Sequence, residues 1–194
     1  MTLGRPLEYD PDQALEAAMQ VFWLRGYEAT SLQELLKAME LSKSSFYQGF
    51  GGKRELFLRC VNRYCEGMSA KLLTMLEEAA SGRAFIERLL LNSASEARRT
   101  DIRRGCLLMN TATEFALKDP EIAARVGTGF EGLRGILTAA IVRGQKEGEI
   151  RRDEDAGALA SYLISSLGGI KTVVKGGADE QRVAEIVRVI LRAL

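Results

Sequence analysis

Residues 30–57, TSLQELLKAMELSKSSFYQGFGGKRELF, decide how this chain is organised. Thr30-Ser31 is a helix N-cap signal, and the apolar spacing after it predicts a helix over residues 32–38. Ser42 is a second cap signal and predicts a short helix over residues 43–48. A short turn separates the two helices, which is typical of a helix-turn-helix.

The chain on both sides of this stretch is also predicted to be helical. Asp10-Pro11 places a cap residue before a proline at the first helical position, and the helix that it starts ends near Gly26. A long helix is expected from Lys53 to about Ala80. Further helices are expected over residues 84–99, 105–117, 120–145 with Asp119 as cap, 154–174 with Asp153 as cap, and 178–194. The predicted fold class is all-α with about nine helices, divided into a three-helix N-terminal unit over residues 1–52 and a helical bundle over residues 53–194.

The composition excludes several classes of protein. The 194 residues include no histidine, which rules out a Ser-His-Asp or Cys-His pair and an imidazole zinc ligand. The three cysteines, Cys60, Cys65 and Cys106, form no CxxC pair and are too few for a disulfide scaffold. The sequence therefore predicts no metal and no cofactor.

Two further features favour a cytoplasmic protein. No apolar run approaches ~20 residues, so no segment is expected to span a membrane. Residues 1–6 lack the apolar stretch of a signal peptide. The reducing cytoplasm is then the expected compartment.

The charge is unevenly distributed along a chain whose net charge is only +1. Residues 43–63 hold five basic residues and one acidic residue, a local charge of +4. Residues 1–42 hold three basic and seven acidic residues, a local charge of −4. A basic segment of this kind can bind phosphates although the whole chain is nearly neutral.

A helix that enters the major groove of DNA must carry polar and small side chains at its N-terminus. Lys43, Ser44 and Ser45 meet that requirement. Apolar residues must also hold the helix against its neighbours, and the residues suited to this are Leu35, Leu41, Phe46 and Phe50.

At this point the sequence resembles a known family. Residues 14–57 are similar to the N-terminal domain of TetR/AcrR-type transcriptional regulators, in register with the predicted helices. The C-terminal part resembles the family only in the number and lengths of its helices. The matching residues are Ala14, Leu15, Ala18, Phe22, Gly26, Tyr27, Thr30, Ser31, Leu35, Leu41, Ser42, Lys43, Ser44, Ser45, Phe46, Tyr47, Phe50, Lys53, Leu56 and Phe57.

The resemblance implies a set of DNA contacts. Three residues match base-reading positions: Lys43, Ser44 and Ser45. Others match phosphate contacts: Thr30 or Ser31, Tyr47 and Lys53. The start of a long helix suits a phosphate, because its free amides and dipole favour an anion. The predicted DNA-binding set is completed by Ser42 and Gln48.

Two positions depart from the family pattern. Gly49 stands where the family often has a histidine, so a phosphate contact is either missing or supplied by Gln48. Ser44 stands where a glycine is more common, which is expected to shift base preference.

The run from Gly127 to Gly132 spells GxGxxG, the pattern of a dinucleotide site. That site requires a strand before the motif, whereas residues 120–126 are predicted to begin a helix. We interpret the glycines as points of close helix approach or as room for a ligand.

Cys106, Asn110 and Glu114 are four residues apart and therefore share one face of a predicted helix. Polar groups on an otherwise apolar face either bind a ligand or satisfy nearby backbone groups. The resulting prediction is a small-molecule effector site, and its apolar walls are expected to be Phe85, Met109 and Phe130.

Cys106 also supports a different interpretation. A basic setting lowers the pKa of a thiol, and four arginines precede the cysteine: Arg98, Arg99, Arg103 and Arg104. A redox or electrophile sensor is therefore an open alternative, although a lone cysteine on an apolar helix stripe is more often a core residue.

The last two predicted helices carry wide apolar faces. Such faces either close the core of the chain or pair with a second copy, and the family resemblance implies the second, a homodimer. The predicted interface residues are Leu159, Leu163, Leu167, Ile170, Val183, Ile186, Val187 and Ile190.

The predicted function is that of a homodimeric TetR-type regulator, a repressor released from a palindromic DNA operator by a small-molecule effector. Residues 1–52 would bind DNA, and residues 53–194 would bind the effector and dimerise. Two rivals belong to other classes. An all-helical enzyme would have to rely on Glu114 with Cys106, and an architectural DNA-binding protein would bind no ligand.

Overall fold

The computed structural model describes residues 9–95, 97, 104–115 and 117–194. In these residues the secondary structure is helical throughout, without a strand. The helices are α1 (Pro11–Arg25), α2 (Leu32–Ala38), α3 (Lys43–Phe50), α4 (Lys53–Glu78), α5 (Gly82–Ser95), α6 (Leu107–Phe115), α7 (Pro120–Glu147), α8 (Ala156–Lys175) and α9 (Glu180–Arg192). The all-α prediction is confirmed.

The helix boundaries follow the cap residues of the sequence. Asp10 accepts hydrogen bonds from two amides of the first turn of α1, and Ser31 forms a capping box with Glu34 at the start of α2. Ser42 caps α3 and Asp119 caps α7 in the same way. These short-range signals explain why α1, α2, α3 and α7 begin at the residues predicted for them.

The predicted cap of α8 is wrong by two residues. Asp155, not Asp153, accepts a hydrogen bond from the amide of Ala158 and so begins the helix. Both oxygens of Asp153 instead accept hydrogen bonds from the Arg151 guanidinium, at 2.7 and 2.6 Å, and this contact lowers the pKa of Asp153 to about 2. The salt bridge engages the carboxylate that was predicted to cap α8. The periodicity of apolar residues does not reveal such a contact.

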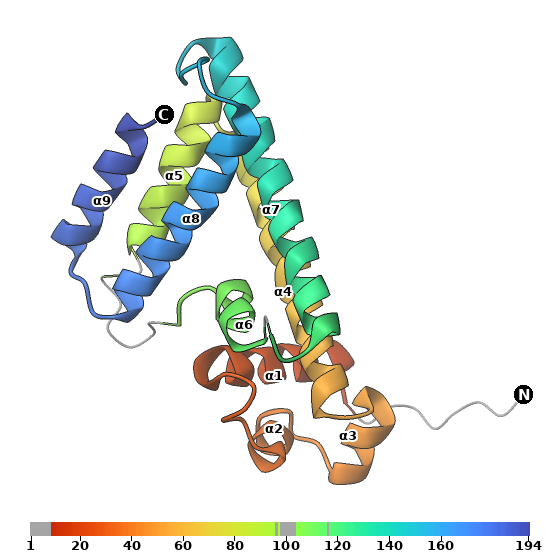
Figure 1. Ribbon diagram of the computed structural model, residues 1–194. Helices are drawn as coiled ribbons and strands as arrows, with labels where there is room; N and C mark the ends of the chain where they lie inside the picture. The colour runs from red at the N-terminus through yellow and green to blue at the C-terminus, as the bar shows by residue number, and fades with distance from the viewer. Residues whose placement is uncertain (1–8, 96, 98–103, 116) are drawn as a thin grey trace, which may run out of the picture.

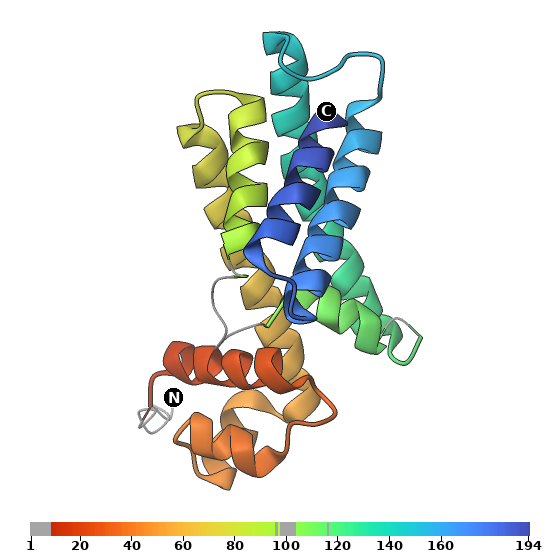
Figure 2. The same ribbon diagram turned by 90° about the vertical axis from the view of Figure 1, so that its left-hand side faces the viewer.

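The helices form a small unit at one end and a taller bundle above it (Figure 1). The small unit holds α1, α2 and α3, and α1 lies across the foot of the long helix α4. Figure 2 shows α5, α8 and α9 side by side in the upper part. Helices α4 and α7 run along each other and join the two parts.

Two hydrophobic clusters fill the interior. The upper cluster joins α5, α7, α8 and α9 to the end of α4. The lower cluster contains the N-terminal unit and the start of α4, but also α6 and the start of α7. The N-terminal unit therefore packs on residues more than sixty positions away in the sequence.

Phe57 of α4 lies at the centre of an aromatic group within the lower cluster. Its ring centroid is 5.0 Å from Phe22 of α1, 5.0 Å from Tyr27 in the next loop and 5.4 Å from Phe115 of α6. Aromatic pairs at these separations stabilise beyond their buried area. One side chain thus connects the N-terminal unit to both α4 and α6.

Helix α8 corrects one expectation from the sequence. It is the one described helix whose length and composition would allow it to cross a membrane, and only 33% of its apolar window is buried within the chain. Length and composition are weak evidence, because a core helix of a soluble protein passes the same test.

Gly82 marks the closest approach between α5 and α7. A Cβ at this position would collide with the carbonyl oxygen of Ala140 and would lie 2.5 Å from the amide nitrogen of Gly144. Both obstacles are backbone atoms, so the two helices can accept a larger residue only by moving apart.

We expect Gly82→Ala to lower the free energy of unfolding by about 1–3 kcal/mol, the usual cost of overpacking. Urea denaturation would measure the change. Gly127→Ala is the matched control, because a Cβ there meets nothing within 4 Å inside α7. Alanine should raise stability at Gly127 by up to about 1 kcal/mol. A Gly82→Ala protein as stable as the wild type would contradict the assignment.

Candidate nucleic-acid interface and its coupling contacts

The N-terminus of α3 is a polar, exposed surface. The Ser42 hydroxyl accepts a hydrogen bond from the Ser45 amide and lies 2.9 Å from the hydroxyls of both Ser44 and Ser45. Lys43 and Ser44 are exposed, and Ser45 is half-buried. The first turn of α3 therefore presents a lysine and a cluster of hydroxyls to any partner.

The opposite face of α3 is anchored in the core. Phe46 is fully buried, and Phe50 is 2% exposed. Tyr47 and Gln48 lie on the exposed side, and 48% of Tyr47 remains accessible. The helix is thus held by two phenylalanines while its polar residues stay free.

Thr30 does not belong to this surface. Its residue is 1% exposed, and its hydroxyl donates a hydrogen bond of 2.6 Å to the carbonyl oxygen of Gly26. The hydroxyl completes the turn after α1 and is not available to a ligand. Of the two residues predicted for this position, only Ser31 is exposed.

The N-terminus of α4 is open. Gly52 supplies no side-chain cap, so the first amides of α4 keep no side-chain partner. The Lys53 ammonium lies 4.2 Å from the centre of the Tyr27 ring, a cation–π contact. The free amides, the helix dipole and the lysine together favour an anion at this end.

The structure explains Gly49, which departs from the family pattern. The Tyr9 hydroxyl occupies the place of a Cβ at this position, and the Tyr9 ring packs against Phe50. The Arg59 guanidinium donates a hydrogen bond of 2.9 Å to the Gly49 carbonyl oxygen. Sequence reasoning missed the role of Tyr9, because no periodic pattern connects it to α3.

Arg54 joins the open end of α4 to the start of α7. Its guanidinium donates hydrogen bonds of 2.9 and 3.0 Å to the two oxygens of Asp119, and one of 2.8 Å to Glu121. The fork geometry is the strongest arrangement for an arginine and a carboxylate. These bonds raise the pKa of Arg54 and lower the pKa of Asp119.

Glu114 was predicted to bind an effector, but the structure uses it differently. Its two carboxylate oxygens accept hydrogen bonds from the backbone amides of Tyr27 and Glu28, at 3.0 and 2.8 Å. The carboxylate on α6 thus holds the loop between α1 and α2. Sequence reasoning had allowed for this outcome, because a polar group on an apolar face either binds a ligand or satisfies backbone.

The predicted effector residues do not converge on one cavity. Phe85 is fully buried in the upper cluster, whereas Cys106 and the partly buried Phe130 belong to the lower cluster. Met109 contacts both clusters, and the Asn110 amide donates a hydrogen bond to the carbonyl oxygen of Arg104. The prediction grouped residues by helix face, and the faces point to different parts of the interior.

The glycines of residues 127–132 lie inside α7, not after a strand. A Cβ at Gly129 would lie 2.8 Å from the Cys65 sulfur and 2.9 Å from Leu108. Gly129 therefore allows α7 to approach α4 and α6 closely, as the helix-packing interpretation expected.

The setting of the thiols does not favour the sensor alternative. Burial raises the pKa of Cys60, and it raises that of Cys65 to about 11. Cys106 is 9% exposed, and the Tyr64 hydroxyl lies 3.4 Å from its sulfur. Of the predicted basic residues, Arg98, Arg99 and Arg103 lie outside the described residues, and Arg104 contacts α1 instead.

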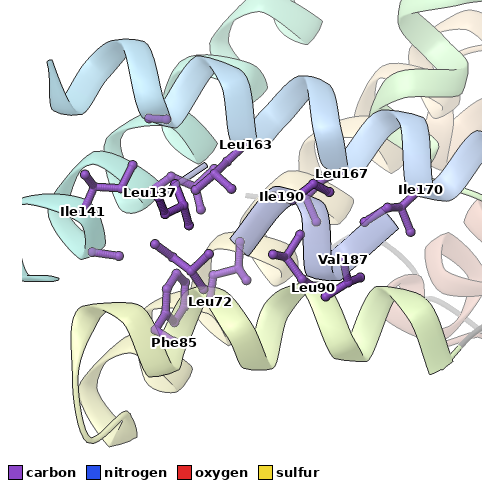
Figure 3. Close-up of a cluster of buried hydrophobic side chains, with 14 of the residues drawn as sticks. Leu72, Phe85, Leu90, Leu137, Ile141, Leu163, Leu167, Ile170, Val187 and Ile190 are labelled. Atoms are coloured by element: carbon purple, nitrogen blue, oxygen red, sulfur yellow. The ribbon is translucent and has the colours of Figure 1, made fainter. Parts of the chain in front are cut away.

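The residues predicted to form a dimer interface mostly face the interior of their own chain. Figure 3 shows side chains of α8 and α9 meeting those of α5 and α7, among them Leu163, Ile170 and Val187. Seven of the eight predicted residues are buried, and only Ile186 is partly exposed. The most apolar stripe of each helix is the one that the chain covers itself, so the prediction chose the wrong face.

The exposed polar N-terminus of α3, the buried phenylalanines beneath it and the open end of α4 define a helix-turn-helix DNA-binding protein. Comparisons with known proteins identify the family. The family profile "Bacterial regulatory proteins, tetR family" matches residues 14–60, and the profile "Tetracyclin repressor-like, C-terminal domain" matches residues 83–190.

Full-length relatives agree with the profiles. The chain is 33% identical over 193 residues to the HTH-type transcriptional regulator YezE of Bacillus subtilis (strain 168), covering 99% of this chain and 100% of the relative. It is 29% identical over 190 residues to the HTH-type transcriptional repressor ComR of Escherichia coli (strain K12), covering 97% and 90%. A cysteine-substituted TetR family regulator, CifR, solved with a 26-bp double-strand operator, superimposes with a TM-score of 0.83 at 29% identity, covering 98% and 99%.

The chain belongs to the TetR family. It is a DNA-binding transcriptional regulator and not an enzyme.

We expect Asp119→Asn to lower the melting temperature at pH 7, because it removes the charge that holds Arg54 while an asparagine can still cap α7. The folded pKa of Asp119 lies below its ordinary value of 3.8. The pair therefore stabilises the fold at neutral pH, and this stabilisation is lost as the pH falls through the folded pKa. Thermal unfolding from neutral to strongly acidic pH should show the two proteins converging.

Glu131→Gln provides the control. Glu131 pairs with Arg134 within α7, and such exposed pairs inside one helix contribute little. A difference between Asp119→Asn and the wild type that stays constant down to strongly acidic pH would contradict the role of the Asp119 charge.

Proposed function

We propose that this regulator is a homodimeric cytoplasmic repressor that binds a palindromic operator and leaves it when a small molecule binds. Residues 1–52 act as the DNA-binding part, and residues 53–194 bind the effector and dimerise. The observation that carries the proposal is the exposed turn of lysine and serines at the start of α3, held rigidly by Phe46 and Phe50.

The DNA contacts divide into two kinds. Lys43, Ser44 and Ser45 read base edges, because they stand at the end of α3 that enters the major groove. The remaining contacts position the protein on the phosphates, and they come from Ser31, Ser42, Tyr47, Gln48 and Lys53. The CifR relative bound to operator DNA supports this use of the helix-turn-helix.

The dimer interface is proposed on the outer faces of α8 and α9 instead of the inner stripes. Tyr162 and Val173 of α8 are 39% and 36% exposed, and Val189 of α9 is 58% exposed. The apolar window of α8 is only one-third buried by its own chain. A second copy that covers these faces would remove apolar surface from water and place two recognition helices on one side of the DNA.

Effector binding is proposed to act through the contacts between α6, α7 and the N-terminal unit. A ligand lowers DNA affinity only by preferring a conformation in which the recognition helices are wrongly spaced. Arg54 with Asp119, and Glu114 with the loop amides of Tyr27 and Glu28, hold α3 and its neighbours against the bundle. A shift of α6 or α7 would therefore move the DNA-binding part.

Lys53→Ala should weaken binding to operator and random DNA alike and reduce the slope of log affinity against log salt by about 0.9, the value of one phosphate contact. Ser45→Ala is the contrasting variant and should change base preference more than non-specific affinity. The measurement is a salt titration by fluorescence anisotropy on an operator selected from a random library. Loss of base preference in Lys53→Ala, or equal loss on both DNAs in Ser45→Ala, would contradict the assigned roles.

Val189→Glu should convert the dimer to a monomer, because it places a charge on the proposed apolar interface. Analytical ultracentrifugation at several concentrations would measure the association. Leu117→Glu is the control, since Leu117 is fully exposed in the loop before α7, away from α8 and α9. If Val189→Glu associates as tightly as the wild type, the outer face of α9 is not the interface.

A further inference from the structure

An open groove separates α1 from α4 where the N-terminal unit meets the long helix. Its volume is about 640 Å³. Its lining comes from these two helices: Glu16, Met19, Gln20, Trp23, Arg63, Tyr64, Glu66, Gly67, Met68, Lys71 and Leu72. A hollow of this size suits a small organic molecule.

The walls of the groove are aromatic and apolar. The ring centroids of Trp23 and Tyr64 are 5.1 Å apart in an edge-to-face arrangement. Both side chains are fixed at their polar ends, because the Trp23 indole donates to the Gly105 carbonyl oxygen at 3.1 Å and the Tyr64 hydroxyl contacts Cys106. Their rings, with Met19 and Met68, leave a preformed apolar surface that suits a flat ring system.

Arg104 does not line the groove itself, but it places a positive charge against Trp23 and Gln20, which do. Its guanidinium carbon lies 5.8 Å from the Trp23 ring, and one terminal nitrogen donates to the Gln20 side-chain oxygen. Its Nε is buried and has no hydrogen-bond partner, and it forms no ion pair with any carboxylate in the described part of the chain. A buried donor without an acceptor is costly, so an acceptor that reached the Arg104 guanidinium by displacing the Gln20 side chain would be favoured.

The charged residues of the lining do not supply that acceptor. Glu16 lies 3.5 Å from Arg63 and also accepts from Gln20. Glu66 and Lys71 are exposed charges of opposite sign. The guanidinium of Arg104, which forms no ion pair with a carboxylate of the described residues, therefore places a positive charge next to an aromatic wall.

We propose that the groove between α1 and α4 binds an aromatic anion, with its ring system against Trp23, Tyr64 and Met68 and its carboxylate or sulfonate replacing the Gln20 oxygen at Arg104. The consequence for DNA rests on the function proposed above: a molecule wedged between α1 and α4 would change how the N-terminal unit sits on the long helix. Binding of the anion to the groove does not itself require DNA.

The test uses a matched pair of probes, 8-anilinonaphthalene-1-sulfonate and its neutral counterpart N-phenyl-1-naphthylamine. Trp23 is the single tryptophan of the chain, so energy transfer from its emission reports a probe bound within transfer range of this one residue, and the variants below locate the probe. We expect one sulfonate probe to bind per chain and the quenching of Trp23 to follow the fraction of chains occupied. The affinity for the sulfonate probe should be at least about tenfold above that for the neutral probe, which corresponds to one hydrogen bond to a charged group.

Two variants test the position of the site. Gly67 lines the groove and Gly127 lies on α7 outside it, and at both a Cβ meets nothing within 4 Å. Gly67→Leu should fill the groove and abolish the binding of both probes. Gly127→Leu, the matched control, should bind them like the wild type. Unchanged binding to a folded Gly67→Leu protein would overturn the proposal.

Two further variants test the charge without filling the groove. Arg104→Gln removes the guanidinium, and Gln20→Glu gives it a carboxylate partner. Each variant should lower the affinity for the sulfonate probe to the affinity for the neutral probe. The affinity for the neutral probe should stay within about twofold of its wild-type value. If one variant does not fold, the other decides. Equal binding of the two probes to the wild type, or an unchanged preference in a folded variant, would overturn the assignment.

The outcomes separate this inference from the proposed function. A chain that binds the sulfonate probe in the expected way but binds no operator refutes the repressor and leaves the site intact. A chain that binds its operator but shows no transfer from Trp23 to the sulfonate probe refutes the site alone.

Discussion

The packing around Phe57 is the interaction on which the rest of the structure depends. This side chain lies at the start of α4 and contacts rings from α1, from the loop after α1 and from α6. Without the lower cluster that this side chain centres, the N-terminal unit would have only three helices with which to bury its apolar residues, and small units bury too little surface to be stable alone. The DNA-binding part therefore takes its orientation from the bundle.

Polar contacts near this aromatic cluster also hold the DNA-binding part against the bundle. Arg54 joins the beginning of α4 to the beginning of α7, and Glu114 of α6 holds the backbone before α2. Lys53 rests on Tyr27, which itself packs on Phe57. Because hydrophobic contacts are non-directional, such hydrogen bonds are what fix the angle of α3 relative to the bundle. We therefore expect a movement of α6 or α7 to shift α3 as well.

The α1–α4 groove lies at the same junction between the DNA-binding part and the bundle. The groove opens between one helix of the DNA-binding part and the helix that carries Phe57, and Arg104 stands beside its Trp23 end. A ligand there would act on the contact between the two parts directly.

The helices and the character of the DNA-binding surface can be predicted from the order of the amino acids alone. Caps at Asp10, Ser31, Ser42 and Asp119 act within three residues, so they can be read from the sequence, and the spacing of Phe46 and Phe50 set which face of α3 is buried. The family resemblance over residues 14–57 came from the same local patterns.

The partner of each apolar face and of each polar group follows only from the folded chain. Periodicity identified the apolar stripes of α8 and α9, but it could not tell whether the same chain or a second copy covers them. The inner stripe, with Leu163 and Val187, turned out to be core. Glu114 and Thr30 were equally ambiguous, because a polar side chain looks the same in sequence whether it meets a ligand or a backbone amide. Their partners lie in the folded chain, and for Glu114 they are more than eighty residues away, a distance that no local pattern records.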